Sequence, residues 1–263
     1  MSTSFPMDGM RVRFAGATDV GQKRTHNEDS IYLPDQERLM VVADGMGGHA
    51  SGDVASAMAV ETMSEFFRTT GESPEITWPF MVNRDGRHDE NRLVTGVKLA
   101  NLKIYELAQT DSRLKGMGTT LVSIYFTEDR VLIAHVGDSR VYLISDGQMS
   151  QVTEDHSLLN DYIKMKRLTR EEAHKFPHKN VIVRALGMRD QVLVDLIKRE
   201  PRLGDVYLLC SDGLCDMVDD DAILEVVKAE QNLDDCCARL VALANQNGGA
   251  DNITVALARV ETP

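Results

Sequence analysis

Four aspartates stand where an apolar, strand-like run of the sequence meets a loop that contains glycine. They are Asp44, Asp138, Asp212 and Asp251. A carboxylate at the edge of a protein core is costly unless a positive charge meets it. If the ends of these runs converge, the four acids repel one another, and a divalent cation removes that conflict. The ligands are oxygens, without patterned cysteine or histidine, so the sequence favours a hard ion, Mg²⁺ or Mn²⁺.

A second interpretation of these aspartates stays open. Asp-Gly occurs five times in the chain, and most such pairs are simply turns, so the acids are also compatible with separate turn and cap residues. An arginine lies beside two further carboxylates in the segment Arg24-Thr25-His26-Asn27-Glu28-Asp29. Its guanidinium offers a planar fork for phosphate oxygens. The alternative is an exposed ion pair, which contributes little stability.

Apolar patterning predicts the elements that must position these residues. Short alternating or β-branched runs predict strands over residues 12–17, 39–43, 121–126, 131–136, 141–145, 206–210 and 253–258. Apolar residues at helical spacing predict helices within 54–67, 93–108, 223–227 and 240–244. Consecutive strands with short turns indicate antiparallel pairing, and the missing βαβ alternation disfavours a Rossmann sheet. We therefore expect an α+β protein in which helices cover antiparallel sheets.

The pattern of strands and helices predicts a single domain over residues 10–262 with two interruptions. Residues 71–89 are expected to form a surface loop. Residues 157–184 contain a capping-box pattern at 169–172, which predicts a short helix. This second segment carries seven Lys or Arg and three Asp or Glu, a local charge of +4. Such a charge is either an ordinary solvated surface or an electrostatic guide for a phosphorylated protein.

Composition and charge exclude several classes of function. The chain has 263 residues, with 29 Lys and Arg against 41 Asp and Glu, which gives a net charge of −12. That acidity argues against binding to nucleic acid and to an anionic membrane. No apolar run approaches the roughly 20 residues of a membrane helix, and the N-terminus lacks the pattern of a signal peptide. We therefore expect a cytoplasmic protein whose four cysteines are small core residues.

A series of short motifs carries a resemblance to a known family. The motifs are Thr18-Asp19-Val20-Gly21 through Arg24, Asn27-Glu28-Asp29-Ser30, Val42-Ala43-Asp44-Gly45-Met46-Gly47-Gly48-His49, Gly118-Thr119-Thr120, Ala134-His135-Val136-Gly137-Asp138-Ser139-Arg140, Asp155-His156-Ser157, Arg184-Ala185-Leu186-Gly187, Cys210-Ser211-Asp212-Gly213-Leu214 and Asp251-Asn252-Ile253-Thr254. In order and spacing they resemble the metal-dependent Ser/Thr protein phosphatases of the protein phosphatase 2C type, in their bacterial form, from about Phe14 to Val260. The resemblance implies a central β-sandwich of two antiparallel sheets flanked by pairs of helices (α-β-β-α), with 157–184 as a small flap subdomain.

The resemblance also implies a metal-binding role for each matching acid. Asp44 is expected to bridge two metal ions, and the carbonyl of Gly45 to complete the first site. Asp212 and Asp251 are expected to hold the second ion. Asp138, with Asp212, resembles the pair that holds a third, weaker ion in bacterial members. The implied cofactor is Mn²⁺ or Mg²⁺.

Substrate binding and proton transfer are implied for a further set of residues. Arg24 is expected to bind the substrate phosphate, and Glu28 and Asp29 to orient metal-bound waters. Animal members carry a histidine directly after the Asp-Gly pair, proposed as a general acid, whereas this chain has Met46 there. Two roles stay open for His49: proton transfer to the leaving group, or packing at the start of a helix.

The resemblance implies hydrolysis of phosphoserine and phosphothreonine in proteins. A hydroxide that bridges the two ions attacks phosphorus in line with the leaving oxygen, and Arg24 stabilises charge on the phosphoryl oxygens. The expected partners are phosphorylated proteins, including a Ser/Thr kinase and its targets, and the expected state is a monomer. One alternative is a regulatory pseudophosphatase, which the four retained aspartates disfavour. The other is a partner-switching phosphatase, which usually carries a fused sensor domain for which this chain has no room.

Overall fold

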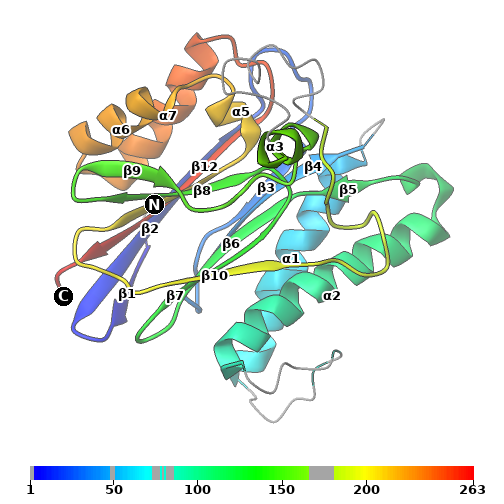
Figure 1. The fold of residues 1–263 in the computed structure, drawn as a ribbon, viewed down its shortest axis with the longest axis horizontal. Helices are drawn as coiled ribbons and strands as arrows, with labels where there is room; N and C mark the ends of the chain where they lie inside the picture. The colour runs from blue at the N-terminus through cyan, green and yellow to red at the C-terminus, as the bar shows by residue number, and fades with distance from the viewer. Residues whose placement is uncertain (1–2, 48–50, 73–77, 79, 81–85, 166–180) are drawn as a thin grey trace.

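Two antiparallel β-sheets pack face to face in this computed structural model, which describes residues 3–47, 51–72, 78, 80, 86–165 and 181–263 (Figure 1). In strand order, the first sheet comprises β1 (Thr3–Met7), β2 (Met10–Asp19), β12 (Ile253–Glu261), β11 (Val206–Cys210), β8 (Arg140–Ser145) and β9 (Gln148–Gln151). The second comprises β10 (Asp195–Arg199), β7 (Val131–Val136), β6 (Leu121–Phe126), β4 (Leu39–Met46) and β3 (Asp29–Tyr32), with β5 (Gly118–Thr119) paired to β4.

The alternation of side chains along each strand divides the core into layers. In β4, Met40 and Val42 face the other sheet, whereas Leu39, Val41 and Ala43 face the helices. Aromatic rings fill the layer between the sheets. The ring of Phe126 lies edge-on to Phe14 (5.6 Å between centroids) and to Tyr207 (5.7 Å). Burial of these rings fixes the register of the strands, because a shift by one residue would turn them away from the core.

Helices cover the outer face of each sheet, which gives the predicted α-β-β-α order (Figure 1). Helices α1 (Gly52–Glu72) and α2 (His88–Thr110) cover the second sheet. Helices α5 (Asp212–Cys215), α6 (Asp220–Ala229) and α7 (Leu233–Gln246) cover the first. Capping side chains start the last two helices: Asp219 accepts a hydrogen bond from the Ala222 amide and Asn232 from the Asp234 amide, each at 2.8 Å.

The strands predicted from apolar runs are confirmed, and β6, β7 and β11 have the predicted bounds. The strands that the patterning did not predict are β1, β3, β5, β9 and β10. Apart from β5, which has only two residues, these are the four edges of the two sheets. An edge strand is partly solvated, so it needs no continuous apolar run. β1 also precedes residue 10, where the expected domain begins.

The two predicted interruptions are partly described. Helix α1 ends at Glu72 and α2 begins at His88, so each reaches two residues into the expected loop 71–89. Trp78 packs on Phe66, with 6.0 Å between ring centroids. In the expected flap, α3 (Leu158–Lys164) was not predicted, and the predicted helix at 169–172 lies outside the described residues. Among the helices of the described chain, none has the length and apolarity required to cross a bilayer.

Candidate metal centre

Five aspartates from distant parts of the chain meet at one end of the sandwich. Asp44 lies near the end of β4, and its register partner across the sheet is Asp29 on β3. Asp212 begins α5 two residues after the end of β11, Asp251 lies two residues before the start of β12, and Asp138 lies between β7 and β8. Like charges on facing strand residues are destabilising. The fold therefore brings acids together at a position where they need a compensating charge.

The electrostatics of Asp44 show that these carboxylates act on one another. Burial raises the pKa of Asp44 well above its ordinary value, and Asp29, Asp212, Asp138 and Asp251 raise it further. Burial, followed by Asp138 and Asp251, raises the pKa of Asp212 to about 7. Asp44 and Asp212 thus resist ionisation beside the neighbouring carboxylates. The interpretation as separate turn and cap aspartates is therefore wrong for this group.

Two of these carboxylates keep a buried oxygen without a donor. Within the described residues, Oδ1 of Asp29 and Oδ1 of Asp138 have no hydrogen-bond partner. The other oxygen of Asp29 accepts hydrogen bonds from Ser211 Oγ (2.8 Å) and Thr254 Oγ1 (2.7 Å). Buried polar atoms are normally satisfied, so unpaired oxygens in an acidic cluster fit a bound cation. An all-oxygen donor set fits Mn²⁺ or Mg²⁺.

A hollow of about 70 Å³ adjoins the cluster beside Asp138 and Asp212, and its lining includes Asp155 and Asp216. Burial, followed by Asp155, raises the pKa of Asp138 to about 6. Arg140 partly offsets the negative charge of Asp155, because its Nη2 donates to Asp155 Oδ2 at 2.7 Å. The site that the resemblance gave to a third ion is thus an acidic hollow.

Glycine at position 45 allows the backbone of three segments to meet. A Cβ atom on Gly45 would lie 2.1 Å from the carbonyl oxygen of Gly52 and 2.6 Å from that of Glu28. The Gly45 amide also donates to the Glu28 carbonyl at 3.1 Å. Any larger residue would therefore separate β4 from the segment that carries Glu28.

Arg24 lies at the edge of the cluster, and it is half exposed. Its Nη2 donates to Asp251 Oδ2 at 2.7 Å. Burial raises the pKa of Glu28, although Arg24 opposes that shift. The side chain of Arg24 thus reaches the acids while its guanidinium stays accessible to an anion.

Asn252 holds the segment with Arg24 and Glu28 in place, a role that the sequence analysis missed. Its Nδ2 donates to the carbonyls of Val20 (3.0 Å) and His26 (2.9 Å), and its Oδ1 accepts from the Glu28 amide (2.8 Å). The side chain is buried. The only signal in the sequence was its place beside Asp251 in a recognised motif.

Two histidines form hydrogen bonds with the backbone amide and carbonyl of Gly137, the residue before Asp138. Its amide donates to His156 Nδ1 (3.0 Å), and its carbonyl accepts from His135 Nε2 (2.9 Å) and from the His156 amide (2.8 Å). His135, His156 and Asp195 are close enough to be considered as metal ligands. However, His156 Nδ1 must be the unprotonated nitrogen, so Nε2 carries the proton that it donates to Asp195 Oδ2 (3.2 Å). These hydrogen bonds leave no free ring nitrogen on His156 for a metal, and through the backbone of Gly137 the two histidines support the residue next to Asp138.

The remaining predicted residues are a histidine and the cysteines. His49 lies outside the described residues, so both of its proposed roles stay predictions. All four cysteines are free, and Cys210, Cys236 and Cys237 are buried, as expected for core residues. Burial raises the pKa of the Cys236 thiol to about 11, which disfavours a nucleophilic thiolate.

Comparisons with known proteins agree with this geometry. The family described as protein phosphatase 2C matches residues 19–257. The chain is 39% identical over 247 residues to the serine/threonine phosphatase stp of Listeria innocua, covering 91% of this chain and 92% of that protein. It is 38% identical over 249 residues to the serine/threonine protein phosphatase PstP of Mycobacterium tuberculosis, covering 95% of this chain and 45% of that protein.

A solved structure resembles this one over nearly its whole length. The crystal structure of the catalytic domain of PstP in complex with two manganese ions superposes with a TM-score of 0.81 at 38% identity, covering 95% of this chain and 98% of that one. Two sheets, their flanking helices and an acidic cluster thus define the class of a metal-dependent hydrolase. The chain belongs to the protein phosphatase 2C family, and it is a serine/threonine protein phosphatase of that family.

Proposed function

We propose that the chain hydrolyses phosphoserine and phosphothreonine in proteins with two divalent metal ions, Mn²⁺ or Mg²⁺, held by the aspartate cluster. The observation that carries this proposal is the convergence of Asp44 with four other aspartates, which raises the pKa of Asp44 and leaves buried oxygens of Asp29 and Asp138 unpaired among the described residues. The two manganese ions in the catalytic domain of PstP, a similar protein, support it.

The ligands of the proposed centre are aspartates of the acidic cluster and the backbone carbonyl of Gly45. Asp44 would contact both ions, with the Gly45 carbonyl on the first and with Asp212 and Asp251 on the second. Asp138 and Asp212 would hold a third, weaker ion at the acidic hollow. When bound, the ions would lower the pKa of a water molecule and neutralise charge on the phosphoryl oxygens.

The protein's own side chains would orient the phosphate and the water. Arg24 would bind two phosphoryl oxygens through its guanidinium, because it is half exposed and fixed at one end by Asp251. Asp29 would accept a hydrogen bond from water at Oδ1, since Ser211 and Thr254 already hold Oδ2. Glu28 would orient a second water from the segment that Asn252 fixes.

We also propose that the enzyme opposes a Ser/Thr kinase, acts in the cytoplasm and is a monomer. The names of the similar proteins, which are bacterial serine/threonine phosphatases, support the first point. Guidance of substrates by the basic segment 157–184 stays a prediction. Of its cations, Lys164 donates to Glu154 Oε2 at 2.5 Å, and Lys166, Arg167 and Arg170 lie outside the described residues. A pseudophosphatase is disfavoured because the metal-binding aspartates are all present.

Phosphate release from matched peptides tests this function. A phosphothreonine peptide and a phosphotyrosine peptide of the same sequence would be incubated with the protein, with Mn²⁺ and then with excess chelator. We expect rapid release from phosphothreonine, slow release from phosphotyrosine and loss of both rates on chelation. Release that persists in chelator contradicts the metal mechanism. Equal rates on both peptides contradict the proposed specificity.

A further inference from the structure

Six large apolar side chains are exposed on the surface of the described residues. They are Met165, Val181, Val183, Met188, Leu193 and Leu203. Three of them, Val183, Met188 and Leu193, line a single hollow of about 350 Å³ together with Met46. We call this hollow the apolar pocket. Monomeric proteins seldom leave such side chains grouped on the surface without a binding role.

The apolar pocket adjoins the proposed catalytic centre through β4 and β5. Met46 is two residues from Asp44 in β4, so the two side chains lie on the same face of the strand. A Cβ atom built on Gly118, the register partner of Met46, would lie 3.6 Å from Met46 Cγ and 3.5 Å from Met188 Sδ. Met46 and Met188 therefore lie side by side over β5.

Polar contacts hold the walls of the apolar pocket in place. The side chain of Asn101, buried on α2, donates to the carbonyls of Arg189 (3.0 Å) and Asp190 (3.1 Å) and accepts from the Gly187 amide (2.9 Å). These bonds fix the turn that presents Met188. On the other side, Arg184 Nη1 donates to Asp195 Oδ1 at 2.6 Å and to the Leu193 carbonyl at 3.3 Å. The pocket is thus formed before any ligand binds, which lowers the entropic cost of binding.

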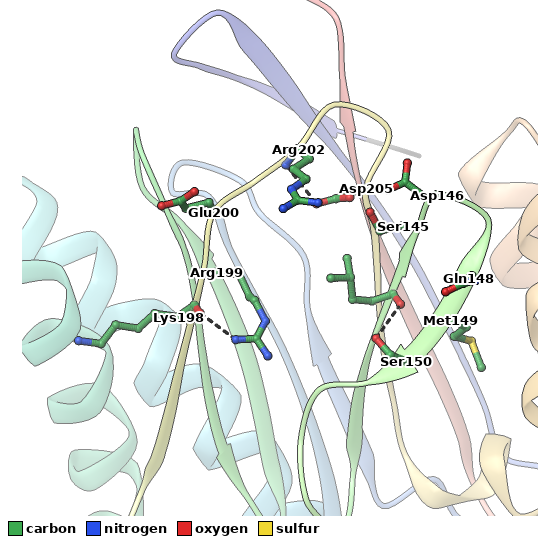
Figure 2. Close-up of a pocket in the computed structure, with 11 residues that line it drawn as sticks. Ser145, Asp146, Gln148, Met149, Ser150, Lys198, Arg199, Glu200, Arg202 and Asp205 are labelled. Atoms are coloured by element: carbon green, nitrogen blue, oxygen red, sulfur yellow. Dashed lines mark hydrogen bonds between the residues drawn. The ribbon is translucent and has the colours of Figure 1, made fainter.

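The charge around the apolar pocket suits a phosphorylated chain. Arg189 and Arg184, the latter paired with Asp195, contribute to its lining, and none of its described lining residues is acidic. This contrasts with the net charge of −12 of the whole chain. A hollow of about 520 Å³ near β8, β9 and β10 differs in this respect (Figure 2). Its lining contains three basic and three acidic residues, so its charge favours neither anions nor cations. They are Lys198, Arg199, Arg202, Asp146, Glu200 and Asp205.

We propose that the apolar pocket is a substrate subsite that receives an apolar side chain of the phosphoprotein, two residues from the phosphoserine or phosphothreonine. The spacing follows from β4, in which the two residues from Asp44 to Met46 span roughly 7 Å. An extended substrate chain covers the same distance with two residues. This inference rests on the proposed function, because the phosphorylated residue must be at the aspartate cluster.

A set of phosphothreonine peptides tests the subsite. Each peptide carries leucine at one position, from two residues before to two residues after the phosphothreonine, with serine elsewhere, and kcat/KM is measured with Mn²⁺. We expect leucine at one of the two outer positions to raise kcat/KM roughly tenfold over the all-serine peptide. The gain should fall at least about threefold in Leu193→Ser and in Met188→Gln, with release from a small aryl phosphate unchanged.

Leu203→Ser is the matched control. The exposed fraction of Leu203 (59%) is similar to those of Met188 (58%) and Leu193 (69%), but Leu203 does not line the pocket. It should keep the full preference for leucine. If the enzyme cleaves all peptides equally, or if Leu203→Ser loses the preference as much as Leu193→Ser, the subsite is refuted and the phosphatase function stands. If the folded wild type cleaves no phosphothreonine peptide with Mn²⁺, the proposed function fails, and the subsite fails with it.

Discussion

Replacing Asp212 with asparagine should stabilise the metal-free protein. In the absence of cations, Asp212 is a carboxylate among other carboxylates, and its pKa in the folded protein is raised to about 7 from an ordinary value of 3.8. The unfolded chain ionises Asp212 freely, so the negative charge costs folding stability. The asparagine side chain would remove the charge and keep nearly the same shape.

The size and pH dependence of this effect follow from the pKa shift. A shift of about three units corresponds to roughly 4 kcal/mol at about 1.4 kcal/mol per unit, and this is an upper limit because asparagine retains a buried polar group. Because the pKa of Asp212 is raised in the folded state, its carboxylate destabilises the folded protein increasingly as the pH rises from 3.8 towards 7. Above pH 7 this destabilisation is constant. At pH 8 in chelator we expect a gain of about 1–4 kcal/mol, or a Tm rise of roughly 3–10 °C. At pH 5 the gain should fall by more than half.

Thermal unfolding followed by circular dichroism measures the effect. Asp146→Asn is the control: Asp146 lies in the turn between β8 and β9 with φ of 51°, a conformation that asparagine also tolerates. It should leave Tm unchanged. Added Mn²⁺ should raise the Tm of the wild type more than that of Asp212→Asn. A Tm for Asp212→Asn below that of the wild type in chelator at pH 8 would refute the electrostatic argument.

Substitutions at three further positions test how the site is supported. Asn252→Ala removes three buried hydrogen bonds and should lower the free energy of unfolding by about 3 kcal/mol in a urea titration, and an unchanged midpoint contradicts its role. His156→Ala should weaken Mn²⁺ binding in calorimetry by roughly tenfold, whereas His156→Asn, which keeps an acceptor for the Gly137 amide, should retain most of it. Equal affinities in both variants would show that the histidine does not act through Gly137. Arg24→Ala should raise KM for an aryl phosphate at least about tenfold with Mn²⁺ affinity little changed, and an unaltered KM contradicts phosphate binding.

The sequence predicted best the strands in which every residue is buried. The runs at 121–126, 131–136 and 206–210 are apolar on both faces because helices cover one face and the other sheet covers the second, and these strands have the predicted bounds. The edge strand β10 reads Asp-Leu-Ile-Lys-Arg and is only partly buried, so periodicity could not find it. The aspartates were found because each follows or precedes a buried strand.

The contacts between distant segments could not be predicted from patterning. Arg24 meets Asp251 across 227 positions of sequence, and Asn252 binds the Glu28 amide across 224. Asn101 supports the turn at 187–190 from a helix, where its polar side chain gave no signal of its partner. These roles depend on how β12 packs beside β2 and how α2 packs over the second sheet, which local propensities do not specify.

Asp44 is the residue proposed to hold both catalytic metal ions. The most direct test is phosphate release from a phosphothreonine peptide during a Mn²⁺ titration, comparing wild type, Asp44→Asn and the Asp146→Asn control, with folding checked by circular dichroism. We predict that Asp44→Asn is folded but slower than the wild type by on the order of 10³-fold at every Mn²⁺ concentration, while the control is unaffected. A folded Asp44→Asn variant that reaches the wild-type rate at saturating Mn²⁺ would show that Asp44 does not hold the catalytic metal ions.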